Sequence, residues 1–438
     1  MSKETFQSLG LNATILQIID QLQFKHPTPI QKQVIPAVLD GQSVIGQSQT
    51  GSGKTHAFLL PLFHQLDADK CEVQIVITSP TRELAFQLHE EVKKMVRLAN
   101  KEGVWTSRLL IGGTDKQRMM EKLKHPPHII VGTPGRIFDM VLSGSLSIYT
   151  ANSFVVDEAD LMLELGLIED VDRLLVRAKE DIQMLVFSAT IPEPLQHFLK
   201  KYLENPVHIK IDGHFSPDTM KHQFIALKYR EKAQVVKEIT TVIQPFLALI
   251  FTNGKQEADA LWEALSIEGL NVGIIHGGLT PRQRKRVLKE IQDLRYEYVV
   301  ATDLASRGID IPGVSHVINA DLPKQLEFYI HRVGRTARAG LEGTAISIYS
   351  EEDLPLIRKL EEKNVDIAYV EVKNDEFVEA KHWHPRKRRQ NKSTVLEKEA
   401  WKRVKKPKKV KPGYKKKLRK EQEKIKKQLA AKQKNRYK

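Results

Sequence analysis

The chain has 438 residues and a mass of 50.0 kDa, which is too long for one ordinary domain and predicts two domains with a tail. Its net charge of +15 is concentrated at one end, because residues 381–438 carry 26 basic and 4 acidic side chains while the rest of the chain has a slight acidic excess. This basic tail has too little apolar surface to offset the entropy of ordering. We therefore expect it to be disordered on its own and to bind a polyanion.

Several classes of protein are excluded at this stage. The single cysteine, Cys71, excludes a disulfide framework and a zinc site built from cysteines. The N-terminus begins no apolar signal segment, and no run approaches the roughly 20 apolar residues that a membrane-spanning helix needs. These features predict a cytoplasmic location.

Short apolar runs alternate with amphipathic segments along most of the chain. In the first half the predicted strands are 43–46, 73–79, 128–132, 153–156 and 183–187, and the clearest predicted helix is 83–98. In the second half the predicted strands are 223–229, 247–251, 272–275, 298–301, 314–319 and 344–349. Runs that are apolar on both faces indicate buried parallel strands, so the predicted fold class is α/β, with parallel sheets covered by helices.

Changes in composition suggest the domain boundaries. Proline, glycine and serine gather before residue 219, and the apolar periodicity fades after Val372. We predict a first lobe over 1–206, a linker over 207–219 that holds one edge strand, a second lobe over 220–372 and a basic tail over 373–438. Within the tail, 415–438 could form a charged helix when bound to a partner.

A phosphate-binding loop follows the first predicted strand and opens a helical segment over 57–66. The loop consists of Ser48, Gln49, Thr50, Gly51, Ser52, Gly53, Lys54 and Thr55. Small residues let backbone N–H groups point at phosphates, and the helix N-terminus favours negative charge. We expect Lys54 to meet the β- and γ-phosphates and Thr55 to offer its hydroxyl to Mg²⁺. Ser48 stands where the general pattern has glycine, and the alternative interpretation is a plain glycine-rich turn.

Acidic residues end the strand predicted at 153–156. Asp157 at such a strand tip can hold Mg²⁺ through water, and Glu158 can polarise an attacking water as a general base. Without the phosphate loop, the same acids would more often form a solvated turn or a helix cap.

The second half contains a segment dense in cations, from His331 to Arg338. Arg335 and Arg338 share one face if the segment is helical, and such a pair suits the charge that grows on a γ-phosphate. The alternative is a solvated basic helix. If these arginines and Lys54 act on one nucleotide, the site exists only when the two lobes close.

Taken together in this order, the motifs resemble the DEAD-box RNA helicases of helicase superfamily 2, from about Phe6 to Val372. The tetrapeptide Asp157-Glu158-Ala159-Asp160 matches the one that gives this family its name. The resemblance implies two tandem RecA-like lobes and hydrolysis of ATP with Mg²⁺. The compact core with a short basic tail is similar to the cold-shock members of the family in bacteria.

The resemblance also implies roles for further residues. Phe24 would stack on adenine and Gln31 would hydrogen-bond its edge, with Gln23 standing where the family usually has glycine. Asp310 would contact the ribose. Ser188 and Thr190, with His331, would couple hydrolysis to strand separation.

The residues implied to hold RNA lie in loops of both lobes. They are Thr81, Arg82, Gly112, Gly113, Thr133 and Arg136 in the first lobe, and Gln283, Arg286, Thr302 and Arg307 in the second. Hydroxyls, glycine amides and arginines grip phosphates without reading bases. In the tail, Trp383, Trp401, Tyr414 and Tyr437 lie among the cations and could stack on bases.

The implied function is local unwinding of short RNA duplexes and remodelling of RNA or RNA–protein complexes. Cold-shock RNA metabolism, ribosome assembly or RNA decay would be the setting, with ribosomal particles or decay proteins as partners. Three alternatives stay open: an RNA chaperone or assembly clamp timed by ATP, a translocating DNA helicase, and a scaffold without catalysis.

Overall fold

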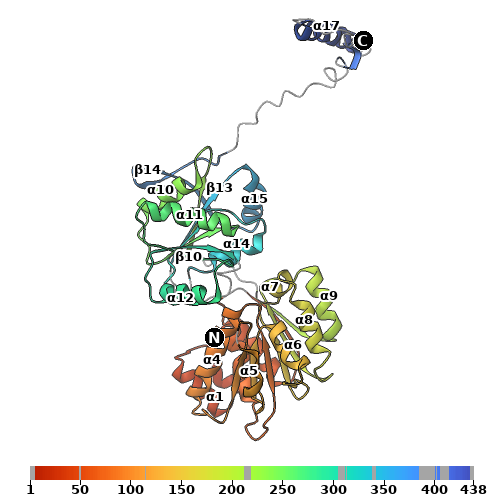
Figure 1. Ribbon diagram of the computed structural model, residues 1–438, viewed down its shortest axis with the longest axis vertical. Coiled ribbons are helices and arrows are strands. Elements are labelled where there is room, and N and C mark those ends of the chain that lie inside the picture. The colour runs from red at the N-terminus through yellow and green to blue at the C-terminus, as the bar shows by residue number, and fades with distance from the viewer. Residues whose placement is uncertain are drawn as a thin grey trace. The chain divides into compact units, whose positions relative to one another are not determined.

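The computed structural model describes residues 5–48, 51–113, 115–211, 219–303, 311, 313–337, 342–383, 400, 402–404 and 414–434. The chain divides into two compact units, Met1–Lys381 and His382–Lys438, and the first unit contains two sheets with their helices (Figure 1). Among the described residues, no helix has the length and apolar character needed to cross a lipid bilayer.

The first lobe is built on a seven-stranded sheet in which every pairing is parallel. Its strand order is β3-β4-β2-β5-β6-β1-β7. The strands are β1 (Val44–Gln47), β2 (Ile75–Thr78), β3 (Ser107–Leu110), β4 (Ile129–Gly132), β5 (Ser153–Val156), β6 (Gln183–Ser188) and β7 (Val207–Lys210). The central strands β2, β4, β5 and β6 are buried along their whole length, as their apolar sequences predict.

Helices cover both faces of this sheet. They are the 3₁₀ helix η1 (Phe6–Leu9), α1 (Ala13–Gln21), α2 (Pro29–Leu39), α3 (Lys54–His64), α4 (Arg82–Leu98), α5 (Lys116–Lys122), α6 (Pro134–Leu142), α7 (Ala159–Glu164), α8 (Ile168–Leu175) and α9 (Glu193–Tyr202). One core joins α1 to α4 to one face of the sheet, and a second core joins α5 to α9 to the other. Alternate residues of each strand enter opposite cores, which fixes the register.

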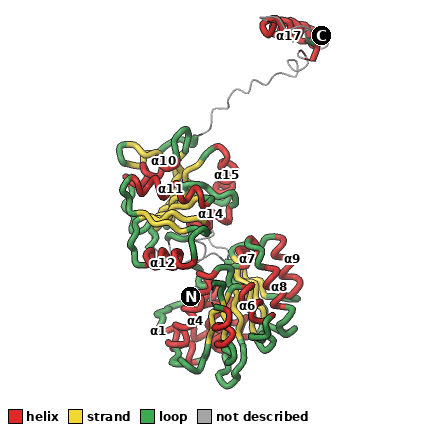
Figure 2. Tube along the Cα trace, viewed as in Figure 1, coloured by secondary structure: helices red, strands yellow, loops and turns green. Residues whose placement is uncertain are grey.

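The second lobe contains an eight-stranded sheet in the order β10-β11-β9-β12-β13-β8-β14-β15, visible as the upper group of strands in Figure 2. The strands are β8 (Met220–Ala226), β9 (Ala248–Thr252), β10 (Val272–Ile275), β11 (Tyr298–Thr302), β12 (His316–Asn319), β13 (Gly343–Tyr349), β14 (Ile367–Lys373) and β15 (Glu376–Glu379). Its helices are α10 (Lys232–Val242), α11 (Lys255–Ile267), α12 (Pro281–Gln292), α14 (Leu326–Val333), the 3₁₀ helix η3 (Glu351–Asp353) and α15 (Leu354–Glu362). All pairings are parallel except β14 with β15.

The structure differs from the sequence-based strands and boundaries at several places. The strand predicted at 223–229 lies three residues earlier, at Met220–Ala226, and β14 was not predicted as a strand. The strand β3 was not predicted, because its Ser107-Arg108-Leu109-Leu110 sequence lies at the sheet edge and keeps three half-buried side chains. The strand β7 pairs with β1 and therefore belongs to the first sheet although it falls within the predicted linker. The second sheet continues through β15, beyond the predicted boundary at Val372.

The tail contains one described helix of substantial length, α17 (Tyr414–Lys434). It occupies most of the segment that the sequence indicated as a possible charged helix. The tail aromatic residues Trp401 and Tyr437, predicted to stack on bases, lie outside the described residues.

Candidate nucleotide and RNA site

The phosphate loop joins β1 to α3, and Lys54 is the first residue of that helix. Its Nζ donates a hydrogen bond to the Ser48 carbonyl oxygen at 2.9 Å, and its side chain is almost fully buried. The Ser48 hydroxyl lies 2.8 Å from the Ser52 hydroxyl. The serine that departs from the general pattern therefore forms a hydrogen bond within the loop. Gly53 has φ 91°, a left-handed conformation that glycine adopts without steric cost. The predicted loop residues Gln49 and Thr50 lie outside the described residues.

The acids Asp157 and Glu158 lie at the carboxyl end of β5, beside the phosphate loop. Lys54 Nζ is 3.6 Å from Glu158 Oε1, which links the loop to the predicted general base. Glu158 has φ 52°, an unusual conformation for a residue other than glycine and one that often marks functional positions. Removal from water raises the pKa of Asp157 to about 7, with a further contribution from the Glu158 carboxylate, although Lys54 opposes the shift.

The donors at this site fit Mg²⁺. Thr55, in the first turn of α3, offers a hydroxyl and Asp157 offers a carboxylate, and hard oxygen donors are what Mg²⁺ prefers. A cation would also counter the burial and the Glu158 repulsion that together raise the pKa of Asp157. Among the described residues no three His, Cys, Asp or Glu side chains form a cage, so phosphate and water oxygens would complete the shell.

A third acid, Asp160, connects three motifs. Its Oδ2 accepts hydrogen bonds from the backbone N–H of Thr190 at 3.0 Å and from the Thr190 hydroxyl at 3.1 Å. The Ser188 hydroxyl accepts from the Asp160 backbone N–H at 3.1 Å, and His331 Nε2 of the second lobe lies 3.8 Å from Asp160 Oδ2. Burial alone would raise the pKa of Asp160, but the His331 contact, with Lys54 and Thr190, outweighs it and holds that pKa well below its usual range.

The residues expected to bind adenine lie next to the phosphate loop and the helix that follows it. Gln31 is buried; its Oε1 accepts from the Thr28 backbone N–H at 2.9 Å and its Nε2 donates to the Gly53 carbonyl at 3.2 Å. Phe24 is half-buried and contacts His56 edge to face, with ring centroids 4.9 Å apart. The motif predicted to read the base is therefore hydrogen-bonded directly to the phosphate loop.

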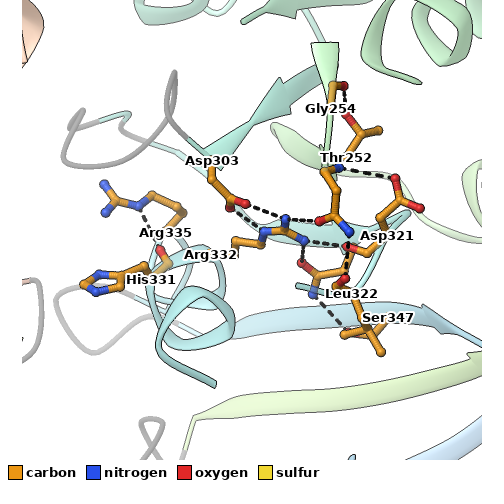
Figure 3. A network of polar contacts seen from close by, with 11 residues as sticks. Thr252, Gly254, Asp303, Asp321, Leu322, His331, Arg332, Arg335 and Ser347 are labelled. Atoms are coloured by element: carbon orange, nitrogen blue, oxygen red, sulfur yellow. Dashed lines mark hydrogen bonds and ion pairs between the residues drawn. The ribbon is translucent and has the colours of Figure 1, made fainter. Parts of the chain in front are cut away.

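In the second lobe, Arg332 occupies the centre of a polar network (Figure 3). Its guanidinium donates to both carboxylate oxygens of Asp303, to the carbonyl oxygen of Asp321 and to Asn253 Oδ1 at 2.8 Å. It also lies over the Phe251 ring, 5.2 Å from the centroid, and only 1% of the residue is exposed. Arg332 thereby ties α14 to the carboxyl ends of β9, β11 and β12.

Arg332 was not among the residues predicted from the sequence, although it lies in the same cation-dense segment. The predicted Arg335 follows the end of α14, is buried, and donates through Nε to the His331 carbonyl at 3.1 Å (Figure 3). The predicted Arg338 and Asp310 lie outside the described residues. One feature of the sequence could have indicated a buried arginine. A polar residue follows each of the neighbouring strands, such as Asp303 after β11.

Three loops of the first lobe bring predicted RNA contacts together. Arg82 lies against the Gly112–Gly113 backbone, so that a Cβ built on either glycine would be 2.8 Å from its guanidinium nitrogens. Arg136 donates through Nε to the carbonyl of the neighbouring Ile111 at 3.2 Å. Thr81 and Thr133 are the N-caps of α4 and α6. These groups share the carboxyl edge of the sheet, because each follows a parallel strand.

The predicted RNA contacts of the second lobe have structural partners. Gln283 closes a capping box at the start of α12, where its Oε1 accepts from the Thr280 backbone N–H at 2.9 Å. Arg286 is exposed and donates to Glu290 at 2.8 Å, and Thr302 is the buried last residue of β11. The predicted Arg307 lies outside the described residues.

A second unpredicted feature is an ion pair between the lobes. Arg284 Nε of α12 lies 3.2 Å from Glu83 Oε1 of α4, and both side chains are more than four-fifths buried. The sequence offered no signal for it, because both residues fall in helix turns rich in charge.

Comparison with known proteins defines the class. Residues 28–198 match the DEAD/DEAH box helicase model, and residues 231–340 match the helicase conserved C-terminal domain model. The structure is similar to Saccharomyces cerevisiae Dbp5 bound to RNA and ADP BeF3, with a TM-score of 0.76 and 30% identity over 84% of this chain and 95% of that one. It is also similar to Mss116p bound to ssRNA and AMP-PNP, with a TM-score of 0.74 and 28% identity over 85% and 81% of the two chains. The predicted fold class, two tandem RecA-like α/β lobes, is confirmed.

Sequence relatives narrow the class to a family. The chain is 48% identical to the DEAD-box ATP-dependent RNA helicase CshB of Bacillus cereus, over 99% of this chain and 100% of the relative. It is 49% identical to the CshB helicase of Bacillus subtilis, over 98% of both chains. The chain belongs to the DEAD-box family of ATP-dependent RNA helicases, as its motifs predicted.

Proposed function

We propose that this helicase opens short RNA duplexes locally, by a closure of its two lobes that ATP and RNA drive together. The observation that carries the proposal is the 3.8 Å approach of His331 to Asp160, because it joins the arginine-bearing helix of one lobe to the acid motif of the other. Asp160 is also bonded to Thr190 of the predicted coupling motif. A change at the nucleotide can therefore be transmitted to both lobes through one carboxylate.

The catalytic roles follow from the chemistry of the groups. Lys54, held between the Ser48 carbonyl and Glu158, binds the β- and γ-phosphates when ATP replaces these partners. Glu158 accepts a proton from the attacking water. Arg335 and Arg338 stabilise the charge that develops on the γ-phosphate. Thr55, and Asp157 through water, would hold Mg²⁺, and the bound cation would neutralise charge on the phosphates.

RNA contacts would be made without base reading. The first-lobe residues Arg82, Gly112, Gly113 and Arg136 offer guanidinium and backbone N–H groups at one sheet edge, which suits a sugar–phosphate backbone. The related Dbp5 and Mss116p structures are bound to RNA and to ssRNA, which supports single-stranded RNA as the ligand. The basic tail would add affinity that depends on salt.

The cellular setting is proposed from the relatives. Similarity to the CshB helicases over nearly the whole chain supports RNA metabolism as the setting. Work in the cold, in ribosome assembly or in RNA decay, and a cytoplasmic location belong to the proposal and not to the names of these relatives.

The deciding experiment measures ATP turnover with RNA, with DNA and without nucleic acid, together with displacement of a short RNA duplex. We expect RNA alone to stimulate turnover and ATP to speed displacement. Stimulation by RNA without ATP-dependent displacement would favour a clamp timed by ATP. Equal stimulation by DNA would reject RNA as the specific partner.

A further inference from the structure

A line of buried polar side chains runs from α14 to the strand β8 in the second lobe. Arg332 Nη1 donates to Asn319 Oδ1 at 3.4 Å, and Asn319 Nδ2 donates to Ser347 Oγ at 3.0 Å (Figure 3). Ser347 also hydrogen-bonds the Tyr329 hydroxyl, which lies 2.8 Å from His222 Nδ1. All five residues are at most 3% exposed, so water competes little for these bonds. The line therefore joins α14 to β12, β13 and β8.

The hydrogen bonds along this line run in one direction. Because Ser347 accepts from Asn319, its own proton is available to the Tyr329 oxygen. The Tyr329 proton is then directed at His222 Nδ1. Burial lowers the pKa of His222 to about 4, so its imidazole is neutral near pH 7 and one ring nitrogen can accept. Since bonds aligned in this way strengthen one another, the Tyr329 hydroxyl is the link whose removal would break two of them.

Helix α14 carries groups for both lobes on different sides. Tyr329 and Arg332 are three positions apart and share one side, where both are buried within the second lobe. His331, two positions after Tyr329, lies on another side and approaches Asp160 to 3.8 Å. Arg335 donates to the His331 carbonyl at 3.1 Å, so its placement depends on the end of the helix. A rotation or shift of this short helix would therefore move His331 and Arg335 together.

We propose that Tyr329 is a positioning residue for ATP hydrolysis, because its hydroxyl, held by His222, fixes the helix that presents Arg335. The Arg332 network alone is one anchor, about which a short helix can pivot. The Tyr329 hydroxyl is a second anchor on the same side of α14, and it removes that freedom. The inference rests on the proposed function, in which Arg335 stabilises the charge that develops on the γ-phosphate.

The first test compares Tyr329→Phe with Tyr369→Phe in the full chain, well below the thermal midpoint of each variant. Both tyrosine rings pack against Phe224, with ring centroids 6.3 Å apart in each case, but the Tyr369 hydroxyl donates to Glu361 of α15 at 2.9 Å. For Tyr329→Phe we expect kcat of ATP turnover stimulated by RNA to fall at least about tenfold, while KM for ATP stays within about twofold. Tyr369→Phe, the matched control, should leave both values within about twofold.

The second test uses variants of His222 to separate positioning from packing. Glutamine offers a carboxamide oxygen that can accept from the Tyr329 hydroxyl, whereas leucine offers no acceptor. We expect His222→Gln to keep kcat within about threefold and His222→Leu to lose as much as Tyr329→Phe. Combining His222→Leu with Tyr329→Phe should be no worse than either change alone, since both break the same link. The two His222 variants also decide the matter if Tyr329→Phe does not fold.

Three results would overturn the inference. They are an equal kcat for Tyr329→Phe and Tyr369→Phe, equal losses for His222→Gln and His222→Leu, and losses that multiply in the double variant. Failure of the proposed function is distinguishable from these, because the unaltered chain would then show no ATP turnover stimulated by RNA.

Discussion

Replacing Arg332 with lysine should strongly destabilise the second lobe. The arginine is 1% exposed, and its five N–H groups bond Asp303, Asp321, Asn253 and Asn319. A lysine keeps the charge but presents one nitrogen with three donors, so it cannot span the Asp303 carboxylate and the two strand ends at once.

The magnitude follows from those interactions. Losing at least two hydrogen bonds to buried polar groups costs about 1–3 kcal/mol each, and breaking a buried ion pair typically costs about 3–5 kcal/mol. Since lysine retains part of the interaction, we expect a loss of about 3 kcal/mol. For a lobe of this size that corresponds to a fall in Tm of about 6–12 °C.

Calorimetry combined with hydrogen exchange on the full chain can measure this effect lobe by lobe. Protection should disappear first in β9, β11 and β12, while peptides of the first lobe should exchange as before. Arg286→Lys, at an exposed pair with Glu290, is the control and should leave the transition in place. A fall in Tm of less than about 2 °C for Arg332→Lys would refute the reasoning that this network holds the strand ends together.

Three further predictions test the active site, the tail and the cores. Glu158→Gln should bind ATP and RNA but release them slowly, so turnover stimulated by RNA should fall at least about 100-fold; normal turnover would rule out Glu158 as the base. Removing residues 382–438 should lower RNA affinity and leave ATP turnover without RNA unchanged. The slope of log affinity against log salt concentration should become less steep by roughly 0.7 for each RNA phosphate that the tail neutralises. An unchanged slope would reject RNA binding by the tail. Burial lowers the pKa of both His89 and His222 to about 4, so unfolded chains bind protons more readily. The free energy of unfolding should therefore be largest above about pH 6.5 and should fall towards pH 4 by up to about 3 kcal/mol for each histidine. Urea unfolding at several pH values measures this fall, and His222→Gln should show a weaker dependence of stability on pH.

The alternation of strands and helices could be predicted because buried parallel strands leave an unmistakable apolar pattern. β5, for example, is the run predicted at 153–156. The edge strand β3 could not be found in this way, since an edge strand has fewer neighbours and tolerates Ser107 and Arg108. The same holds for β15, whose two apolar residues are flanked by exposed glutamates and resemble a solvated segment.

The position of a candidate site residue was predictable where a local motif fixes the backbone around it. It was less predictable where residues far apart in the sequence determine which way the side chain points. The phosphate loop and the acids after β5 were located from spacing alone. Among the arginines of the second lobe, spacing cannot tell which one turns inward, because that depends on Asp303, Asn253 and Asp321 from three different strands. The left-handed backbone of Gln23 after α1, with φ 59°, was equally hidden, since the sequence shows only a departure from the glycine usual in the family.

The acid motif shows how the fold gives one residue type two electrostatic roles. Asp157 and Asp160 are three positions apart, yet the pKa of the first is raised to about 7 and that of the second is held well below its usual range. Asp157 is buried and lies next to the Glu158 carboxylate, and both features favour its protonated form over its charged form. Asp160 receives bonds from Thr190 and the approach of His331, so it stays ionised and serves as a fixed anchor between motifs. Asp160→Asn should therefore weaken the dependence of ATP turnover on RNA more than it weakens ATP binding, because it removes the charge that the second lobe contacts.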